Sequence, residues 1–397
     1  MRYPEIPSFR EAVRWALADK ATRRQTRYVL EQWDDARQEG MARWGDDLRI
    51  AIKAIRSQTI NQWKHLTQTF QTAANQHGVI THFAPTAKDA ASLIQLITER
   101  STNKEVVAPW APILDEIHAE EAVQRGGGHI TYVDVGGYVL QQGRERPAHP
   151  VHLLAHLTTR DIGLLLAERW DQEPRFEVSF LARQITARTR HALMKADIGL
   201  VGGTFAVAET GHIVLLDPEG ARVMAATLPR KVIVVLGLES IVPTWRDVSL
   251  LSRAFWLGAT GEDTVPLAVA LPGPEEGEDA PEEFHVILVD NGRQRMGDSA
   301  YREALYCLHC GACATACPLF REVGGQVYGG PHMGPVGAVW AAFLRPDEFK
   351  DLPFASTLCG ACAAACPVGI DIPGLLARLR KDWKEKGRMW YWGRGRI

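Results

Sequence analysis

The sequence predicts a protein of the α/β + α class, in which an α/β domain has helical segments before and after it. Apolar strands alternate with amphipathic helices through residues 77–295, which is typical of a layered domain with a largely parallel or mixed sheet. Residues 1–76 instead carry apolar side chains near helical spacing among charged ones. All 7 cysteines lie beyond residue 306, so we expect residues 296–386 to form a domain of their own.

Composition narrows the class of protein. At 397 residues the chain is long enough for two or three domains, and 46% hydrophobic with 23% charged residues is typical of a soluble globular protein. The net charge of −2 predicts no nucleic-acid partner. The N-terminus lacks a secretory signal, and the longest apolar stretch, residues 231–242, is too interrupted to be a transmembrane segment. The cysteine distribution fits a reducing compartment, so we expect a cytoplasmic protein.

The predicted elements follow from the chain in order. Residues 8–76 predict helices that pack on the α/β domain, with breaks at Gly40 and Gly45. A strand at 78–84 is followed by a helix that Thr86 can cap. The further elements expected up to residue 271 are strands at 105–108, 130–140, 198–201, 231–236 and 265–271, and helices at 113–125, 160–169, 178–195 and 247–255.

The chain changes character after residue 271. Residues 272–283 are acidic and proline-rich, as in a solvated loop, and a last strand follows at 284–289. We place the domain boundary near residue 295. The tail at residues 387–397 is aromatic and basic, and the hypotheses for it are a partner contact, a lid over the helical domain or a frayed end. Helices are expected before Cys307, at 336–344 and at 372–386.

The cysteine spacing is the strongest functional signal. In bacterial ferredoxins the spacing C-x-x-C-x-x-C-x-x-x-C-P places three thiolates on one [4Fe–4S] cluster and the fourth on a second. Structural zinc sites pair two C-x-x-C knuckles, and disulfide frameworks belong to small secreted chains, so iron–sulfur clusters fit better than either. The first motif here is Cys307, Cys310, Cys313 and Cys317 followed by Pro318, and the second is Cys359, Cys362 and Cys366 followed by Pro367.

The two motifs repeat with one substitution. Adding 49 to the numbers of Cys310, Cys313 and Cys317 gives those of the second motif, whereas adding 49 to 307 leads to Ser356. The second of the two clusters is therefore a [4Fe–4S] cluster with a non-cysteine or open fourth site, or a [3Fe–4S] cluster. The crossed ligand rule assigns Cys307, Cys310, Cys313 and Cys366 to cluster 1, and Cys317, Cys359 and Cys362 to cluster 2.

Other candidate residues carry weaker signals. Gly202 and Gly203 lack the pattern of a phosphate-binding loop, which favours turn glycines. Glu209, at a strand edge beside glycine turns, is the weak candidate for a catalytic residue, although such a glutamate is more often a hydrogen-bonding strand end. His152 and His156 have no third ligand nearby, so a core or interface position is expected for both.

The sequence resembles that of the lactate utilization protein B family, the iron–sulfur subunits of a three-protein L-lactate oxidation system. The resemblance extends from about residue 65 to 386 and includes the missing thiolate at position 356. The chain departs from the family at residues 107–110, where relatives usually have a lysine- and serine-rich stretch. The residues that carry the resemblance are 196–200, 205–211, 228–229 and 241–243 in the α/β domain, and 288–293, 301–313, 317–318, 358–362 and 365–368 around the cysteines.

The resemblance implies a first domain similar to the sugar-isomerase and CoA-transferase-like α/β fold, and a second similar to the α-helical ferredoxin module. It implies an electron-transfer subunit of a complex that oxidises L-lactate to pyruvate, rather than the lactate-binding catalyst. The implied partners are a cysteine-rich subunit resembling heterodisulfide reductase and a small subunit with only the lactate-utilization domain. The alternative hypothesis makes the α/β domain itself catalytic or ligand-binding toward a small carboxylate or CoA-like ligand, with Glu209 involved and the clusters regulatory or structural.

Overall fold

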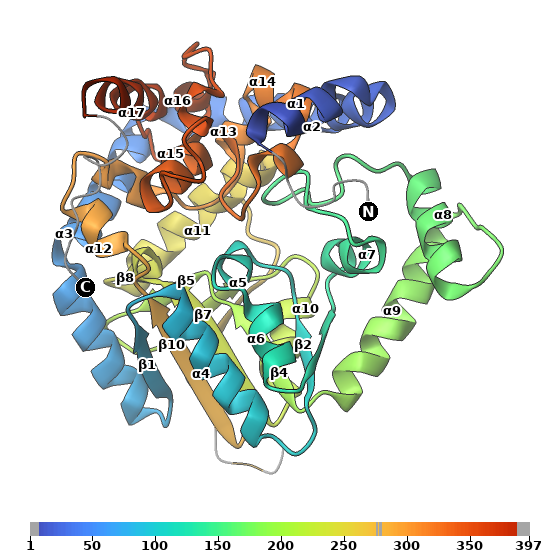
Figure 1. Cartoon of the computed structure of the whole chain (residues 1–397). Helices are drawn as coiled ribbons and strands as arrows, with labels where there is room; N and C mark the ends of the chain where they lie inside the picture. The colour runs from blue at the N-terminus through green and yellow to red at the C-terminus, as the bar shows by residue number, and fades with distance from the viewer. Residues whose placement is uncertain (1–7, 275–276, 278–279, 387–397) are drawn as a thin grey trace.

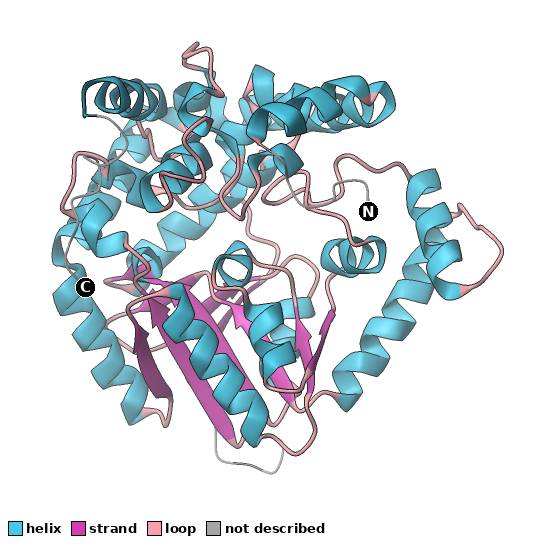
Figure 2. Cartoon of the chain, in the orientation of Figure 1, coloured by secondary structure: helices cyan, strands magenta, loops and turns pink. Residues whose placement is uncertain are grey.

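The structure, a computed structural model, describes residues 8–274, 277 and 280–386. Strands and the helices that cover them occupy one half of the molecule, and helices alone make up the half that carries the cysteines (Figure 1; Figure 2). An α/β part and a helical part are therefore both present, as the sequence predicts. The tail at residues 387–397 lies outside the described residues. No helix in the described part of the chain is long and apolar enough to cross a membrane.

A six-stranded parallel sheet forms the centre of the α/β half. Its strand order is β1-β10-β7-β4-β2-β3, and all neighbouring strands pair in parallel. The central strands are buried on both faces, which explains their uninterrupted apolar runs. The strands are β1 (Ile80–Ala84), β2 (Glu105–Ala108), β3 (His129–Tyr132), β4 (Ile198–Gly202), β7 (Lys231–Gly237) and β10 (Glu283–Val289).

Helices cover one face of this sheet, and a second sheet covers much of the other. The first face buries apolar side chains against α4 (Ala87–Arg100), α5 (Pro112–Glu116) and α6 (Ala119–Arg125). The opposite face packs on α10 (Ala221–Thr227), on α3 (Gly45–Gln76) and on the second sheet. That sheet has the order β8-β5-β6-β9 and consists of β5 (Phe205–Val207), β6 (Ile213–Leu216), β8 (Ile241–Val242) and β9 (Ala268–Leu271).

The N-terminal helices connect the two halves of the molecule. The sequence predicts that they pack on the α/β domain; α3 does so, whereas α1 (Phe9–Ala18) and α2 (Lys20–Ala42) lie mainly against the cysteine-rich half (Figure 1). The helix break expected at Gly40 is absent: Gly40 lies within α2, where this helix crosses α11 (Trp245–Thr260). A Cβ atom on Gly40 would stand 2.0 Å from the carbonyl oxygen of Gly261, so this close crossing requires glycine.

The cysteine-rich half consists mostly of short helices joined by tight turns. Its longest helices are α15 (Gly334–Leu344), which is buried on almost every side, and α17 (Ile372–Lys386), which packs against it. Both helices were expected from the sequence. The shorter elements are α12 (Arg293–Gly297), α13 (Ala312–Thr315), α14 (Pro318–Val323), α16 (Ala361–Ala365) and the single-turn helices η2 (Arg302–Tyr306), η3 (Gly325–Tyr328) and η4 (Leu352–Phe354).

Two predicted elements differ from the structure. The strand predicted at 130–140 ends at Tyr132 and is followed by α7 (Val135–Gly143), because Asp134 accepts a hydrogen bond from the Gly137 backbone and caps this helix. The helix predicted at 113–125 is divided into α5 and α6 by His118, which has a φ of 53°. The predicted helices α8 (Thr159–Trp170) and α9 (Val178–Lys195) are present and pack with α7 at one side of the sheet (Figure 1).

Arg293 joins the two halves. It follows β10 closely, is 1% exposed, and donates hydrogen bonds to both carboxylate oxygens of Glu116, at 2.7 and 2.9 Å. It also donates to Glu239, which follows β7. Its guanidinium lies 5.1 Å from the ring centroid of Trp340 on α15. Burial alone would lower the pKa of Arg293, but Glu116 and Glu239 raise it, so the side chain remains charged.

We expect Arg293→Met to lower the free energy of unfolding by about 3–5 kcal/mol, because two buried carboxylates lose their countercharge. Urea unfolding followed by tryptophan fluorescence measures the change. Arg230→Met is the matched control, since Arg230 pairs with Glu282 at the surface and its loss should leave the unfolding midpoint nearly unchanged. Equal effects of the two substitutions would contradict the role given to Arg293.

Candidate functional site

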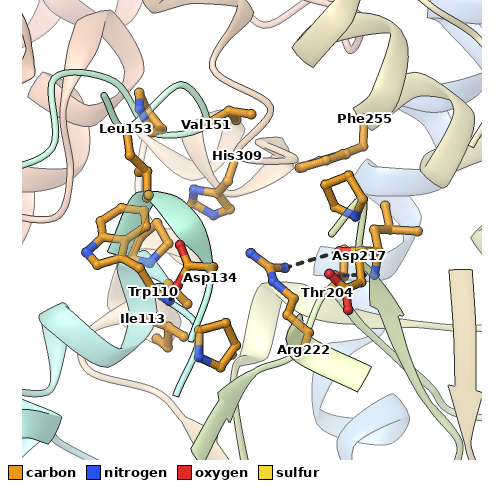
Figure 3. Close-up of a pocket in the computed structure, with 18 of the residues that line it drawn as sticks. Trp110, Ile113, Asp134, Val151, Leu153, Thr204, Asp217, Arg222, Phe255 and His309 are labelled. Carbon is orange, nitrogen blue, oxygen red and sulfur yellow. Dashed lines mark hydrogen bonds between the residues drawn. The ribbon is translucent and has the colours of Figure 1, made fainter. Parts of the chain in front are cut away.

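A cavity of about 500 Å³ lies at the junction of the two halves. The loops that follow β2, β3, β4 and β7 line it, so it stands at the carboxyl ends of parallel strands, where α/β domains commonly bind ligands. Leu308 and His309 close it from the cysteine-rich half, and Trp110 and Phe255 are aromatic walls. Figure 3 shows side chains from both halves around one common space.

Four cysteines surround a smaller cavity directly beside the first. Cys307, Cys310, Cys313 and Cys366 line it together, although Cys366 comes from the second motif. These are the cysteines that the sequence assigns to cluster 1; the ligand assignment itself stays a prediction. The wall between the two cavities contains residues that line both, namely Pro112, Pro150, Leu308, His309 and His332.

The other three cysteines form a second group. Cys317, at the N-cap of α14, interacts electrostatically with Cys359, and both interact with Cys362. Cys317 and Cys362 are buried, whereas Cys359 is exposed, so this group reaches the surface. Tyr328 lies between the groups: burial raises its pKa, and Cys317, Cys313 and Cys362 add to this rise.

The surroundings of the thiols fit iron–sulfur clusters. Burial raises the pKa of Cys310 and that of Cys362 to about 12, so the free thiols are protonated at neutral pH until iron displaces the proton. Nη1 of Arg56 and Oη of Tyr328 are among the buried donors that lack a hydrogen-bond partner within the described residues. Arg56 lies near Cys307, where its positive charge can compensate a negatively charged cluster.

The spread of the thiols is also compatible with clusters. No three His, Cys, Asp or Glu side chains in the described part of the chain are arranged to share a single metal ion. In an iron–sulfur cubane each thiolate binds a different iron atom, so the ligands need not converge on one point. Four thiols around one cavity are the arrangement that such a group needs.

Arg222 is a functional candidate that the sequence analysis missed. It lies on α10, which the sequence pattern did not indicate, and its guanidinium extends into the cavity (Figure 3). It donates a hydrogen bond of 3.4 Å to the Leu216 carbonyl and forms no ion pair with any described residue. Burial lowers its pKa. A guanidinium held in this way has donors left for a carboxylate or phosphate ligand.

Three acidic residues near Arg222 are bound to backbone amides instead. Asp134 accepts two such hydrogen bonds, both of 2.7 Å. Asp217 accepts two, of 2.9 and 3.3 Å, and Glu219 accepts one of 3.1 Å. Burial raises the pKa of Asp134 and that of Glu219 despite these bonds. The guanidinium therefore remains available to a ligand.

Glu209 is not brought to this cavity. Its Oε1 accepts a hydrogen bond of 2.8 Å from the Trp245 backbone at the start of α11, which is a structural role. Gly202 and Gly203, in contrast, do line the cavity. A Cβ atom on Gly203 would stand 2.7 Å from Leu236, so the glycine allows β4 and the following turn to lie close to β7.

His152 and His156 occupy interior positions. The ring of His152 stacks on Trp33, with centroids 4.2 Å apart. Burial lowers the pKa of His152 to about 4, so it is neutral at physiological pH. His156 is 1% exposed, and its Nε2 lies 3.8 Å from the Glu145 carboxylate. In the described part of the chain neither histidine belongs to a metal-binding group.

Comparison with known proteins assigns each half of the molecule to a domain family. The family model of the LUD domain matches residues 67–289, and that of the 4Fe-4S dicluster domain matches residues 303–370. Lactate utilization protein B of Bacillus subtilis (strain 168) is 34% identical over 353 residues, which are 88% of this chain and 73% of that protein. The Escherichia coli (strain K12) protein YkgF, named an uncharacterized electron transport protein, is 33% identical over 384 residues, 96% of this chain and 81% of that protein.

A crystal structure of a DUF162 family protein from Deinococcus radiodurans covers 57% of this chain and 98% of that chain at 18% identity, with a TM-score of 0.31, which is too low to bear on the fold. The sequence matches give a clearer result than this structural comparison. The LUD-domain match includes most of the residues that line the cavity, and the dicluster-domain match includes every cysteine. The chain belongs to the lactate utilization protein B family.

Proposed function

We propose that this chain is the iron–sulfur electron-transfer subunit of a complex that oxidises L-lactate to pyruvate. The observation that carries the proposal is the exchange between the cysteine motifs, in which Cys366 joins the first group and Cys317 joins the second. Two-cluster ferredoxins place their ligands in this crossed way. The names of the relatives supply the substrate, since lactate utilization proteins B resemble this chain over most of its length.

Two clusters suit this reaction because it releases two electrons. Oxidation of lactate to pyruvate removes two electrons and two protons, whereas a cluster takes up one electron at a time. The cysteines proposed for cluster 1 lie beside the cavity, and those proposed for cluster 2 reach the surface at Cys359, which supports a route for electrons between the interior and a partner. We propose the partners that the resemblance implies, a heterodisulfide-reductase-like subunit and a small lactate-utilization-domain subunit, and a cytoplasmic location.

An anaerobic reduction assay tests the proposal. The iron-loaded chain is mixed with L-lactate, alone and with the two partners, and the visible absorbance of the clusters is followed. A relay subunit bleaches only when the partners are present. Bleaching of the chain alone would make the α/β domain the catalyst, and a lack of bleaching in every mixture would refute the role in lactate oxidation.

Cys310→Ala should lower the bound iron by about four atoms per chain, because cluster 1 loses a ligand while cluster 2 keeps its own. Iron analysis and EPR spectroscopy measure this, and lactate-dependent bleaching should be lost as well. The control Ala361→Ser adds a hydroxyl within the second motif, between Cys359 and Cys362, and leaves every cysteine in place. Full iron and full reduction in Cys310→Ala would be incompatible with the assignment.

A second candidate function is ligand binding by the α/β domain, which the cavity and Arg222 favour. We propose that the cavity takes a small carboxylate, paired with the Arg222 guanidinium. The cavity volume of about 500 Å³ is ample for a small organic molecule. The wall that contains His309 separates this cavity from the four cysteines proposed for cluster 1, which supports a ligand that exchanges electrons with it. This hypothesis keeps the ligand class expected from the sequence but replaces Glu209 by Arg222.

Arg222→Gln should raise the dissociation constant of L-lactate or pyruvate about 10- to 100-fold, since a charge-assisted hydrogen bond contributes about 1.5–3 kcal/mol. Isothermal titration calorimetry on the iron-loaded chain measures the affinity. The control is Glu209→Gln, which keeps an oxygen that can accept the hydrogen bond at α11 and should bind like the wild type. Loss of binding in Glu209→Gln, with Arg222→Gln unchanged, would contradict this site.

A further inference from the structure

We propose that Ser356 is the fourth ligand of cluster 2 and binds iron through its Oγ. The inference rests on the two clusters proposed above and goes beyond them, because it concerns the one position at which the repeated motif replaces cysteine by serine. It gives cluster 2 a complete ligand set from this chain alone.

The two motifs share an unusual backbone. His309 has a φ of 59°, and Leu358, which is 49 positions later, has a φ of 58°. Gly311 and Gly360, at the same offset, have φ values of 80° and 89°. Residues other than glycine rarely adopt positive φ, so two such residues in register indicate that the chain follows the same path in both motifs. Each path leads into a short helix, α13 or α16.

The first residue of each motif also makes the same hydrogen bond. The backbone N–H of His309 donates to Sγ of Cys307, at 3.2 Å. The backbone N–H of Leu358 donates to Oγ of Ser356, at 3.1 Å. The serine oxygen therefore stands where the first motif has its predicted ligand sulfur, and the side chain is turned toward its own motif.

The chain around Ser356 is held in this conformation. The guanidinium of Arg380 donates hydrogen bonds to the carbonyl of Ser356, at 2.6 Å, and to that of Pro353, at 2.8 Å. The neighbouring hydroxyl of Thr357 is a different case, because Thr357 corresponds to Leu308 in the first motif, which has no ligand atom. Of the two neighbouring hydroxyl groups, only that of Ser356 therefore occupies the position of a ligand in the repeated motif.

Ligation by serine is chemically balanced without another reactant. An Fe–O bond forms as the O–H bond of the serine breaks, the proton passes to solvent, and no atom changes its oxidation state. Oxygen is a harder ligand than sulfur, and ligand identity tunes the reduction potential of a cluster. The substitution thus gives cluster 2 a different potential from cluster 1 within a repeated framework.

Iron analysis and EPR spectroscopy of the full chain test the inference without lactate. We expect the wild type and Ser356→Cys to hold about eight iron atoms, and Ser356→Ala to fall to about seven after mild oxidation, with the signal of an oxidised [3Fe–4S] cluster. Ser356→Cys should also shift the midpoint potential of cluster 2 and leave that of cluster 1 unchanged. Thr357→Ala is the matched control: it removes a hydroxyl that hydrogen-bonds to Cys359 but does not occupy the ligand position of the repeat, so it should keep about eight iron atoms and give no [3Fe–4S] signal.

The outcomes separate this inference from the proposed function. Ser356→Ala with about eight iron atoms and a wild-type spectrum overturns the serine ligand and leaves the two-cluster proposal intact. An unchanged potential in Ser356→Cys overturns it as well. A wild type with only about four iron atoms overturns the two-cluster proposal itself.

Discussion

Arg293 carries a positive charge into the interior at the point where the central sheet ends and the helical half begins, and Glu116 and Glu239 hold it there. Removing either sign of charge would leave the other buried and uncompensated. The same two carboxylates reach across to the cysteine-rich half, where His332 lies 3.2 Å from Glu116 and His309 lies 3.5 Å from Glu239. One network of carboxylates, Arg293 and histidines therefore connects the lining of the cavity with residues beside the first group of cysteines.

The buried Arg293 and the half-buried Arg222 differ in the partners of their guanidinium groups. Arg293 is bonded to two carboxylates, and its charge is fully used inside the protein. Arg222 has a weak bond to a carbonyl, while the acidic residues near it are engaged by backbone amides. Exposing such a guanidinium to a cavity is favourable only if water or a ligand completes its hydrogen bonds. The difference supports the proposal that a ligand of the cavity pairs with Arg222.

The sequence predicts best those features that depend on near neighbours. The two cysteine motifs are evident because the spacing of the ligands is a local property of the sequence. The run from Ile130 to Leu140, in contrast, is apolar enough for either a strand or a helix, and the cap at Asp134 decides where the helix begins. Arg222 lies on a helix of seven residues, too short for a periodic signal, and its role arises only when α10 packs under the sheet. Glu209 is a residue type that is common in active sites, but its carboxylate accepts a hydrogen bond from the Trp245 backbone at the start of α11.

The two cysteine groups differ in their access to solvent, since Cys310, Cys313 and Cys366 are buried while Cys359 is exposed. An iron–sulfur group at the surface can exchange electrons with a docked protein over a short distance. Dioxygen and peroxide reach the same place, and accessible sulfur is the first to be oxidised. With the clusters in their proposed positions, damage by air begins at Cys359 and spares the deeper cluster. A partner that docks over Cys359, as proposed above, would also shield that thiol from these oxidants.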